Sequence, residues 1–250
     1  MSTQTSADNL WNLPASQFPD RATTYWDIVA DAEIAGQPLD ILEIGVFRAT
    51  LLRGLLKRTD VQVGTYIGID PYLGDERDSY TGAYWKDKGE ANEVWVEAKR
   101  VFDESGYELI RCCSHEFYAE SSTRVWDLII IDGDHRYPAA LWDLHHWFKR
   151  LKPGGIIIGD DYANSDTPAV TRAVNVFIRM NKENICRSGY RVLPFQNKGK
   201  EIPISLTIVF FMKSQNPKET KSWSYQFEAK QQIHPIRRIL RSFRFDVIRI

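Results

Sequence analysis

Residues 126–135 carry the sequence WDLIIIDGDH, and residues 153–162 carry the sequence PGGIIIGDDY. Each stretch contains a short, continuous, β-branched apolar run, which is typical of a strand buried on both faces of a parallel sheet. In such sheets ligands bind outside the carboxyl ends of the strands, and here both runs end beside acidic residues. The two stretches therefore predict an α/β fold with a ligand site at Asp132 and Asp134 on one strand end and at Asp160 and Asp161 on another.

The rest of the chain repeats this alternation of strands and helices. Apolar runs predict strands at residues 40–46, 65–70, 107–112, 126–132, 155–160, 190–195 and 204–212, and helical periodicity predicts helices at residues 22–36, 49–57, 90–105, 138–151 and 169–181. The connection at residues 196–203 is too short for a crossover, so the last two strands should pair antiparallel. We expect a Rossmann-like, doubly wound, seven-stranded sheet, mostly parallel with the last strand antiparallel, and helices on both faces.

Three segments are expected along the chain: an N-terminal arm and helix at residues 1–38, the α/β domain at 39–213 and a basic appendage at 214–250. The 250 residues are 43% hydrophobic and have a formal net charge of −1, which does not favour a nucleic-acid partner. No apolar stretch approaches the ~20 residues of a membrane span. The N-terminus shows no secretory signal, and the cysteines form no CxxC pair, so we expect a cytoplasmic protein.

The end of the first predicted strand is the expected cofactor site. Residues 42–50 carry the sequence LEIGVFRAT, with one glycine where a dinucleotide-binding loop would have three. Gly45 falls where the chain must turn sharply, and with Glu43 it suits S-adenosylmethionine, which has no phosphate to bind. Asp70 ends the second strand and is placed to accept both ribose hydroxyls; a turn-forming aspartate is the alternative. Ser114, just past the third strand, is expected to contact the adenine or to be an ordinary loop serine.

Residues 230–250 contain six lysine or arginine residues and one acidic residue. Four apolar residues recur at helical spacing, with arginines on the opposite side. We expect a helix whose apolar stripe packs on the body of the protein or on a partner subunit, as in a homo-oligomer. A basic helix on an anionic membrane surface and a nucleic-acid contact are the alternatives.

The two quoted stretches, extended to residues 126–137 and 151–162, resemble class I S-adenosylmethionine-dependent methyltransferases. They are most similar to the group that contains the macrocin and related antibiotic-sugar O-methyltransferases and the cephalosporin hydroxylase-associated methyltransferases. Residues 70–76, DPYLGDE, also resemble members that carry Gly-Asp-Glu after the second strand. The resemblance extends over about residues 39–182 and implies the fold described above, S-adenosylmethionine as the cofactor and methyl transfer as the activity.

The resemblance also implies roles for the acidic residues. In the metal-dependent sugar enzymes, acids that match Asp132, Asp160 and Asp161 hold a magnesium ion, and the acid that matches Asp134 is the proposed general base. Asp132 is expected to border the cofactor as well. His135 is the second candidate for the base, with a structural or cofactor-contacting histidine as the alternative. The three metal-ligand candidates could instead close turns or cap a helix.

The expected reaction is magnesium-dependent O-methylation of a hydroxyl on a small molecule or a glycosyl unit. A bound magnesium ion lowers the pKa of a hydroxyl and fixes its position, and carboxylate oxygens suit this ion. Aromatic residues at 72–95 could stack on the acceptor or pack their loop onto the body of the protein. Metal-independent methylation of nitrogen or of a macromolecule, and a non-catalytic protein that keeps the fold, are the alternatives.

Overall fold

The computed structural model describes residues 21–32, 34, 37–73, 87–164, 167–195 and 204–215. The predicted N-terminal arm at residues 1–20, most of the aromatic loop and the basic segment at residues 230–250 lie outside the described residues. Among the described helices, none combines the length and the apolar composition that crossing a membrane requires.

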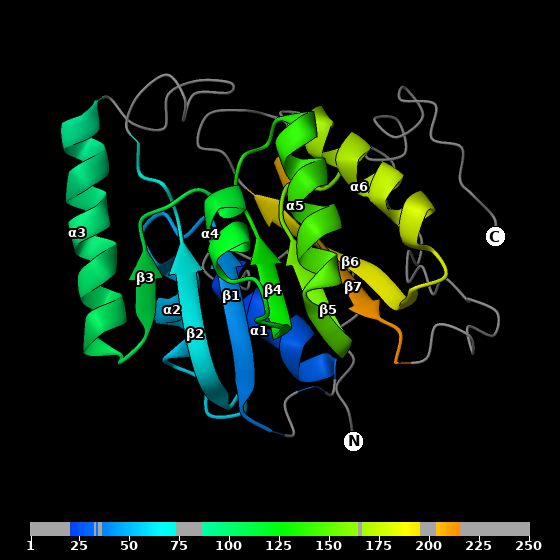
Figure 1. The fold of residues 1–250 in the computed structure, drawn as a ribbon, viewed down its shortest axis with the longest axis horizontal. Helices are drawn as coiled ribbons and strands as arrows, with labels where there is room; N and C mark the ends of the chain where they lie inside the picture. The colour runs from blue at the N-terminus through cyan, green and yellow to red at the C-terminus, as the bar shows by residue number, and fades with distance from the viewer. Residues whose placement is uncertain are drawn as a thin grey trace.

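The described strands form a single seven-stranded sheet (Figure 1). They are β1 Leu39–Ile44, β2 Val63–Ile69, β3 Glu108–Ile110, β4 Trp126–Ile131, β5 Leu151–Gly159, β6 Ile185–Phe195 and β7 Ile204–Lys213. Their order is β3-β2-β1-β4-β5-β7-β6. Strands β1 to β5 pair in parallel, whereas β7 runs antiparallel to both of its neighbours, β5 and β6. The predicted fold class is therefore confirmed, including the reversal of the last strand.

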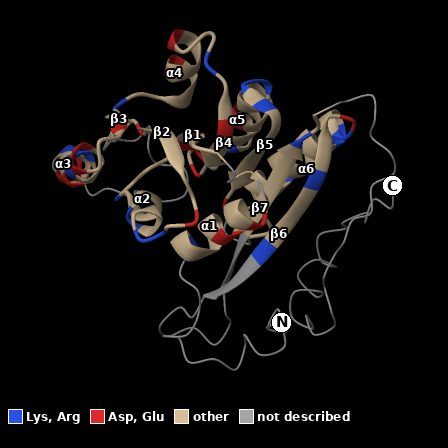
Figure 2. Ribbon diagram, turned by 90° about the horizontal axis from the view of Figure 1, so that it is seen from below, with Lys and Arg blue, Asp and Glu red and all other residues tan. Residues whose placement is uncertain are grey.

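Helices cover both faces of the sheet (Figure 2). They are α1 Arg21–Asp31, α2 Thr50–Leu55, α3 Lys88–Glu104, α4 Ser114–Glu120, α5 Tyr137–Lys149 and α6 Pro168–Asn181. Helices α1, α2 and α3 pack into one hydrophobic cluster, and α4, α5 and α6 pack into the other. Because the helices bury both faces, the strands between them can be apolar throughout.

Strand β4 shows how the apolar run produces this layered packing. Successive side chains of a strand point to opposite faces of the sheet. Leu128 and Ile130 accordingly enter the cluster beneath α1, α2 and α3, whereas Ile129 and Ile131 enter the cluster beneath α4, α5 and α6. The acidic residue that follows this strand is therefore held at the end of a rigid, fully packed element.

The structure differs from the predicted elements at several ends. Helix α4 was not predicted: it has only seven residues, too few to show a helical period, and Glu116 closes its first turn by accepting a hydrogen bond from the Cys113 backbone N–H at 2.7 Å. Helix α1 ends at Asp31 rather than at Gly36. Strand β6 begins at Ile185 rather than at residue 190 because its pairing with β7 extends that far.

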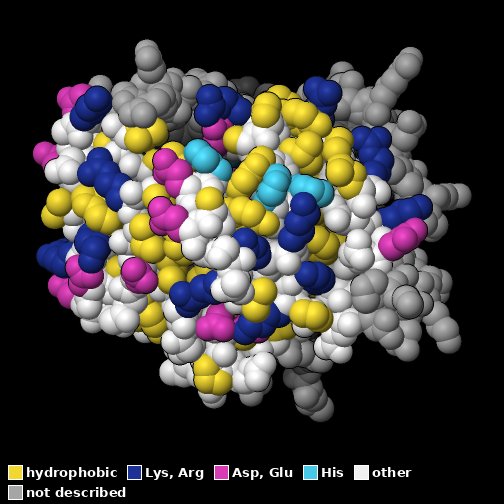
Figure 3. Space-filling view, in the orientation of Figure 1, with side chains coloured by type: hydrophobic (Ala, Val, Ile, Leu, Met, Phe, Trp, Pro, Cys, Tyr) yellow, Lys and Arg dark blue, Asp and Glu magenta, His cyan; other side chains and the backbone are white. Residues whose placement is uncertain are grey.

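Histidine side chains lie among hydrophobic ones on the face that carries α4 and α5 (Figure 3). His146 stacks on Trp142 with ring centroids 4.1 Å apart, and its Nδ1 lies 2.9 Å from the Trp142 carbonyl oxygen. Tyr118 of α4 meets the same two rings edge to face. These contacts pack the short helix α4 against α5.

Candidate active site

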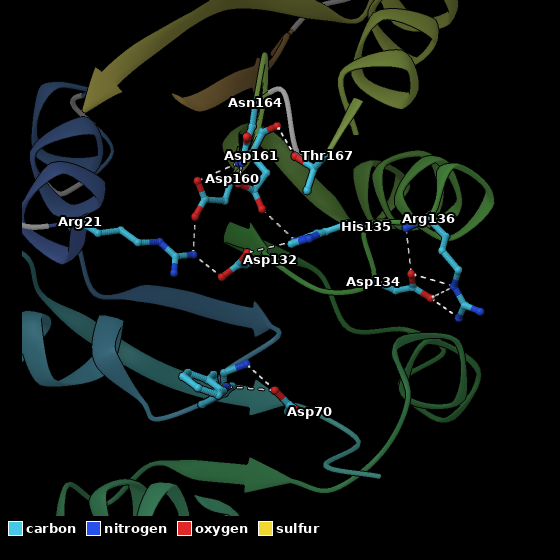
Figure 4. Close-up of polar contacts among 12 residues, drawn as sticks. Arg21, Asp70, Asp132, Asp134, His135, Arg136, Asp160, Asp161, Asn164 and Thr167 are labelled. Carbon is cyan, nitrogen blue, oxygen red and sulfur yellow. Dashed lines mark hydrogen bonds and ion pairs between the residues drawn. The ribbon is translucent and has the colours of Figure 1, made fainter. Parts of the chain in front are cut away.

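Three aspartates gather at the carboxyl ends of β4 and β5, and an arginine from the distant helix α1 joins them (Figure 4). Asp132 follows β4, and Asp160 and Asp161 follow β5. The guanidinium of Arg21 forms ion pairs with Asp132 and with Asp160, the latter at 2.5 Å between Nη2 and Oδ2. The structure thus brings together the predicted metal-ligand candidates and adds a cation that the sequence did not indicate.

Adjacent aspartates can serve one site only if the backbone turns between them, and it does so here. Strand β5 ends at Gly159, and Asp161 has a positive φ of 58°. The Asp161 backbone N–H donates to Oδ1 of Asp160 at 2.8 Å, and the Asn164 side-chain amide donates to Oδ1 of Asp161 at 2.7 Å. These bonds aim Asp160 at Arg21 and leave Oδ2 of Asp161 facing His135.

His135 completes a group of side chains that could hold a metal ion. Its Nε2 lies 3.2 Å from Oδ2 of Asp161 and 3.6 Å from Oδ1 of Asp132. One donor atom from each of these three residues lies within 4.8 Å of the others. Two carboxylates and one imidazole suit a divalent cation such as manganese or iron, and the carboxylates also suit magnesium. The donors therefore fit a divalent metal, although the group contains His135 in place of the predicted Asp160.

The pKa values in the cluster follow from burial and from the charged side chains that each residue faces. Burial and the neighbouring Asp132 raise the pKa of Asp160 to about 7, and burial also raises the pKa of Asp161. Burial opposes ionisation of Asp132, but Arg21 and His135 outweigh it and lower the pKa of Asp132. Burial acts to lower the pKa of His135, but Asp132 and Asp161 outweigh it and raise this pKa. The cluster is therefore rich in carboxylates that a further cation would stabilise.

Asp134, the predicted general base, lies beside this cluster and points toward Arg136 (Figure 4). The Arg136 Nε donates to Oδ2 of Asp134 at 2.8 Å, and its Nη2 contacts the same oxygen. The backbone N–H of Arg136 donates to Oδ1 at 2.9 Å. Asp134 nevertheless lines the same small cavity as Asp132 and Asp160, which apolar residues of α5 and α6 close on the other side.

The predicted cofactor turn lies directly next to the metal-ligand candidates. Gly45 adopts a φ of +86°, and a Cβ atom there would lie 2.0 Å from the carbonyl oxygen of Asp132. This position therefore requires glycine, both for its backbone conformation and for the close approach of the chain. Glu43 is 1% exposed and accepts a hydrogen bond of 2.6 Å from the Tyr66 hydroxyl. Burial raises the pKa of Glu43 to about 8.

Asp70 ties the cofactor turn to the end of β2 (Figure 4). Its Oδ2 accepts hydrogen bonds from the backbone N–H groups of Val46 and Phe47, both at 3.0 Å, and its Oδ1 accepts one from Tyr72 at 3.1 Å. The turn-forming role that the sequence left open is thus realised. A carboxylate oxygen has more than one lone pair, so these bonds also leave Asp70 able to accept from a ribose. Tyr72, from the predicted aromatic loop, is fully buried against Trp95.

Ser114, the predicted adenine contact, begins helix α4 and takes part in a buried polar network. It contacts Asp143 of α5 and accepts a hydrogen bond of 2.7 Å from the Trp147 indole N–H. Burial raises the pKa of Asp143 to about 7. The sequence did contain a signal for this network, because Asp143 lies on the apolar stripe of α5 beside Ala140, Leu144 and Trp147.

Comparison with known proteins identifies the class of this arrangement. Residues 42–162 match a family model described as a methyltransferase domain. The precorrin-6y C5,15-methyltransferase from Geobacter metallireducens aligns with a TM-score of 0.51 and 12% identity over 81% of this chain and 93% of its own. The O-methyltransferase from Bacillus cereus in complex with SAH aligns with a TM-score of 0.49 and 15% identity over 81% and 86%.

An uncharacterized protein of Acanthamoeba polyphaga mimivirus is 25% identical over 142 residues. That alignment covers 56% of this chain and 59% of the viral protein, so the chain spans less than two thirds of that relative. The sheet order, the reversed β7 and the matched domain together define a Rossmann-like methyltransferase fold. Residues 42–162 thus match a methyltransferase domain, and the sheet around them has the fold of the class I S-adenosylmethionine-dependent methyltransferases.

Proposed function

We propose that the protein is a metal-dependent O-methyltransferase that transfers the methyl group of S-adenosylmethionine to a hydroxyl of a small molecule or a glycosyl unit. The observation that carries the proposal is the convergence of Asp132, His135 and Asp161, whose donor atoms lie within 4.8 Å of one another. This group borders the cofactor turn, because the backbone of Asp132 lies against Gly45. A cation site and a methyl donor would therefore be neighbours.

A hydroxyl needs such a site because it is a poor nucleophile at neutral pH. A divalent cation held by Asp132, Asp161 and His135 would supply Lewis acidity, which lowers the pKa of a hydroxyl and fixes its oxygen. The packed end of β4 holds the first of these ligands, and the turn after β5 holds the second. The contribution of the chain is chiefly orientation, because the reactivity for methyl transfer resides in the cofactor.

Asp134 is the proposed proton acceptor. It lines the same cavity as Asp132, and its neighbour His135 faces the cluster. Proton removal from the acceptor hydroxyl accompanies formation of the new oxygen–carbon bond and cleavage of the carbon–sulfur bond, which leaves S-adenosylhomocysteine. To accept the proton, the Asp134 carboxylate must exchange its contacts with Arg136 for the substrate hydroxyl. Catalytic hydrogen bonds of this kind often form only in the complex with substrate.

The test compares isosteric variants at the carboxyl ends of β4 and β5 with a control variant near the start of β4. Asp132→Asn or Asp161→Asn should reduce turnover with a panel of hydroxylated acceptors by at least 100-fold, while S-adenosylhomocysteine affinity changes less than about tenfold. Asp127→Asn is the matched control, because Asp127 lies at the opposite end of the same strand and pairs with Lys152. Full turnover by the Asp132 and Asp161 variants in the presence of a chelator would disprove the metal-dependent mechanism.

One observation favours a second function, metal-independent methyl transfer to nitrogen or to a macromolecule. The guanidinium of Arg21 already pairs with both Asp132 and Asp160, so a protein cation could take the place of the metal. This hypothesis predicts that the wild-type protein keeps its turnover in the presence of a chelator and that Arg21→Gln loses turnover. The metal-dependent reading predicts the opposite response to the chelator.

A further inference from the structure

Arg21 reaches the end of the sheet from a separate element and contacts two of the acidic residues at once (Figure 4). Its Nη2 atom pairs with Oδ2 of Asp132 and with Oδ2 of Asp160. The side chain also crosses the Tyr25 ring, with 5.6 Å between the guanidinium carbon and the ring centroid. One nitrogen therefore pairs with both carboxylates. Arg21 does not form the bidentate pair with a single carboxylate that makes arginine–carboxylate bonds strong.

The position of Arg21 is not explained by the stability of its own helix. Arg21 is the first described residue of α1, where the helix dipole disfavours a positive charge, and the described first turn, from Arg21 onward, contains no acidic residue to offset it. Its Nε is buried and has no hydrogen-bond partner among the described residues. The side chain is therefore held chiefly by Asp132 and Asp160, and its polar groups are only partly satisfied.

These contacts divide the cluster into two halves. Arg21 pairs with Asp160 and with one oxygen of Asp132, whereas the other oxygen of Asp132 faces His135, which also faces Asp161. Asp160 is 5% exposed, so its pairing with Arg21 replaces the water that it has lost. Asp160 lies next to the proposed metal ligands, and its ion pair with Arg21 keeps its carboxylate from binding the metal with them.

We propose that Arg21 is a built-in counter-cation that competes with the divalent metal for Asp132 and Asp160, and so sets the metal affinity of the site. This inference rests on the proposed metal site. A divalent ion among Asp132, His135 and Asp161 would lie close to the guanidinium, and like charges repel strongly where water is excluded. Removing the charge of Arg21 would end this repulsion and release Asp160 as an additional carboxylate ligand.

The coupling must be reciprocal, because two ligands that weaken each other do so by the same factor. Metal binding should therefore loosen the hold of Asp132 and Asp160 on Arg21. Arg21 belongs to the first turn of α1, so this turn should open more often when metal is bound. The site would then have two states, one closed by Arg21 and one loaded with metal.

The experiment is calorimetric titration of Mn²⁺ into the full chain at pH 8, for the wild type, Arg21→Gln, Asp160→Asn and the double variant. We expect Arg21→Gln to bind Mn²⁺ at least tenfold more tightly than the wild type. Asp160→Asn should change the affinity of the wild type less than threefold but weaken the affinity of Arg21→Gln at least tenfold. This non-additivity is what a double-mutant cycle detects when two residues act on each other.

Two further measurements keep the inference testable. Arg136→Gln removes an arginine that pairs with Asp134 instead, and it should shift the Mn²⁺ affinity less than threefold. Hydrogen exchange of the amides at residues 25–28, which donate to the carbonyls of the first turn of α1, should accelerate when Mn²⁺ saturates the wild type and should not respond to Mn²⁺ in Asp132→Asn. If Arg21→Gln does not fold, Arg21→Lys together with this exchange measurement decides the matter, because lysine keeps the charge and should keep the weak affinity.

The outcomes separate this inference from the proposed function. Equal or weaker Mn²⁺ binding by Arg21→Gln, with clear binding by the wild type, would overturn the role of Arg21 and leave the metal site standing. Absence of Mn²⁺ binding in every variant would overturn both. Tighter binding by Arg21→Gln, abolished by adding Asp132→Asn, would support both.

Discussion

Gly45 and Asp132 pack backbone to backbone: a Cβ atom at Gly45 would lie 2.0 Å from the carbonyl oxygen of Asp132. Gly45 belongs to the turn after β1, and Asp132 follows β4, the strand beside β1 in the sheet. The Asp132 backbone N–H donates to the Ile44 carbonyl at 2.8 Å, which fixes this approach from the other side. The cofactor turn and the proposed metal ligand are therefore joined by backbone atoms that cannot yield as a side chain would.

Gly45→Ala should destabilise the protein severely and abolish cofactor binding. Alanine at a left-handed φ costs about 1–2 kcal/mol in strain alone, and the clash with Asp132 adds to this cost. Gly106→Ala is the matched control, because Gly106 also has a positive φ of +74° but nothing lies within 4 Å of its Cβ position. Urea unfolding should show a loss of about 1–2 kcal/mol for Gly106→Ala and a clearly larger loss for Gly45→Ala. Equal losses would refute the close-packing argument.

Glu43→Gln should change how stability depends on pH. The pKa of Glu43 rises from 4.5 to about 8 in the folded protein, so between these values the native state keeps a proton that the unfolded state has lost. The contribution of this proton to the unfolding free energy is complete below pH 4.5. It falls by about 1.4 kcal/mol per pH unit as pH rises from 4.5 to 8.

Glutamine cannot titrate, so the unfolding free energy of Glu43→Gln should fall less steeply over this window. Asp143 and Asp160 also titrate near pH 7, so the informative quantity is the difference between the wild type and the variant at each pH. If the unfolding free energies of the wild type and of Glu43→Gln, measured in urea, changed with pH in parallel, Glu43 would be ionised in the native protein.

Asp70→Asn should weaken cofactor binding about tenfold or more. The amide has one acceptor oxygen where the carboxylate has two, and bonds to a charged acceptor are worth about 1.5–3 kcal/mol. To separate support of the turn from ribose binding, S-adenosylhomocysteine should be compared with its 2′-deoxy analogue. The wild type should prefer the parent compound and Asp70→Asn should lose that preference. If Asp70→Asn kept the preference, the role of Asp70 would be limited to supporting the turn through its contacts with Val46, Phe47 and Tyr72.

Asp134→Asn should reduce kcat by about 100-fold or more, which is the usual contribution of a general base. The affinities for S-adenosylhomocysteine and for Mn²⁺ should stay within threefold, because Asp134 points away from the donor group toward Arg136. Single-turnover kinetics would measure the chemical step directly. Turnover within threefold of the wild type would remove Asp134 from the mechanism.

The sequence was sufficient to predict the sheet, because its evidence was local. The apolar run before Asp132 specifies a strand buried on both faces, and the short connection at residues 196–203 forces the reversal of β7. Gly45 was predictable for the same reason, since a single glycine after a buried strand indicates a sharp turn.

The site was predicted less completely because its decisive contacts are long-range. Arg21 lies 111 positions from Asp132, and no pattern in either segment indicates that they meet. The separation of Asp160 from Asp161 depends on one backbone torsion, which composition does not reveal. Asp143 lay within reach of sequence reasoning, since an acid on the apolar stripe of α5 must find a buried partner.

The most direct test of the account is calorimetric titration of S-adenosylhomocysteine and of Mg²⁺ into the purified protein, each also into Asp161→Asn. The account predicts micromolar cofactor binding with metal or chelator present, together with a separate metal signal that Asp161→Asn lacks. Cofactor binding with no metal signal would contradict the metal-dependent mechanism. Absence of cofactor binding under every condition would contradict the methyltransferase function itself.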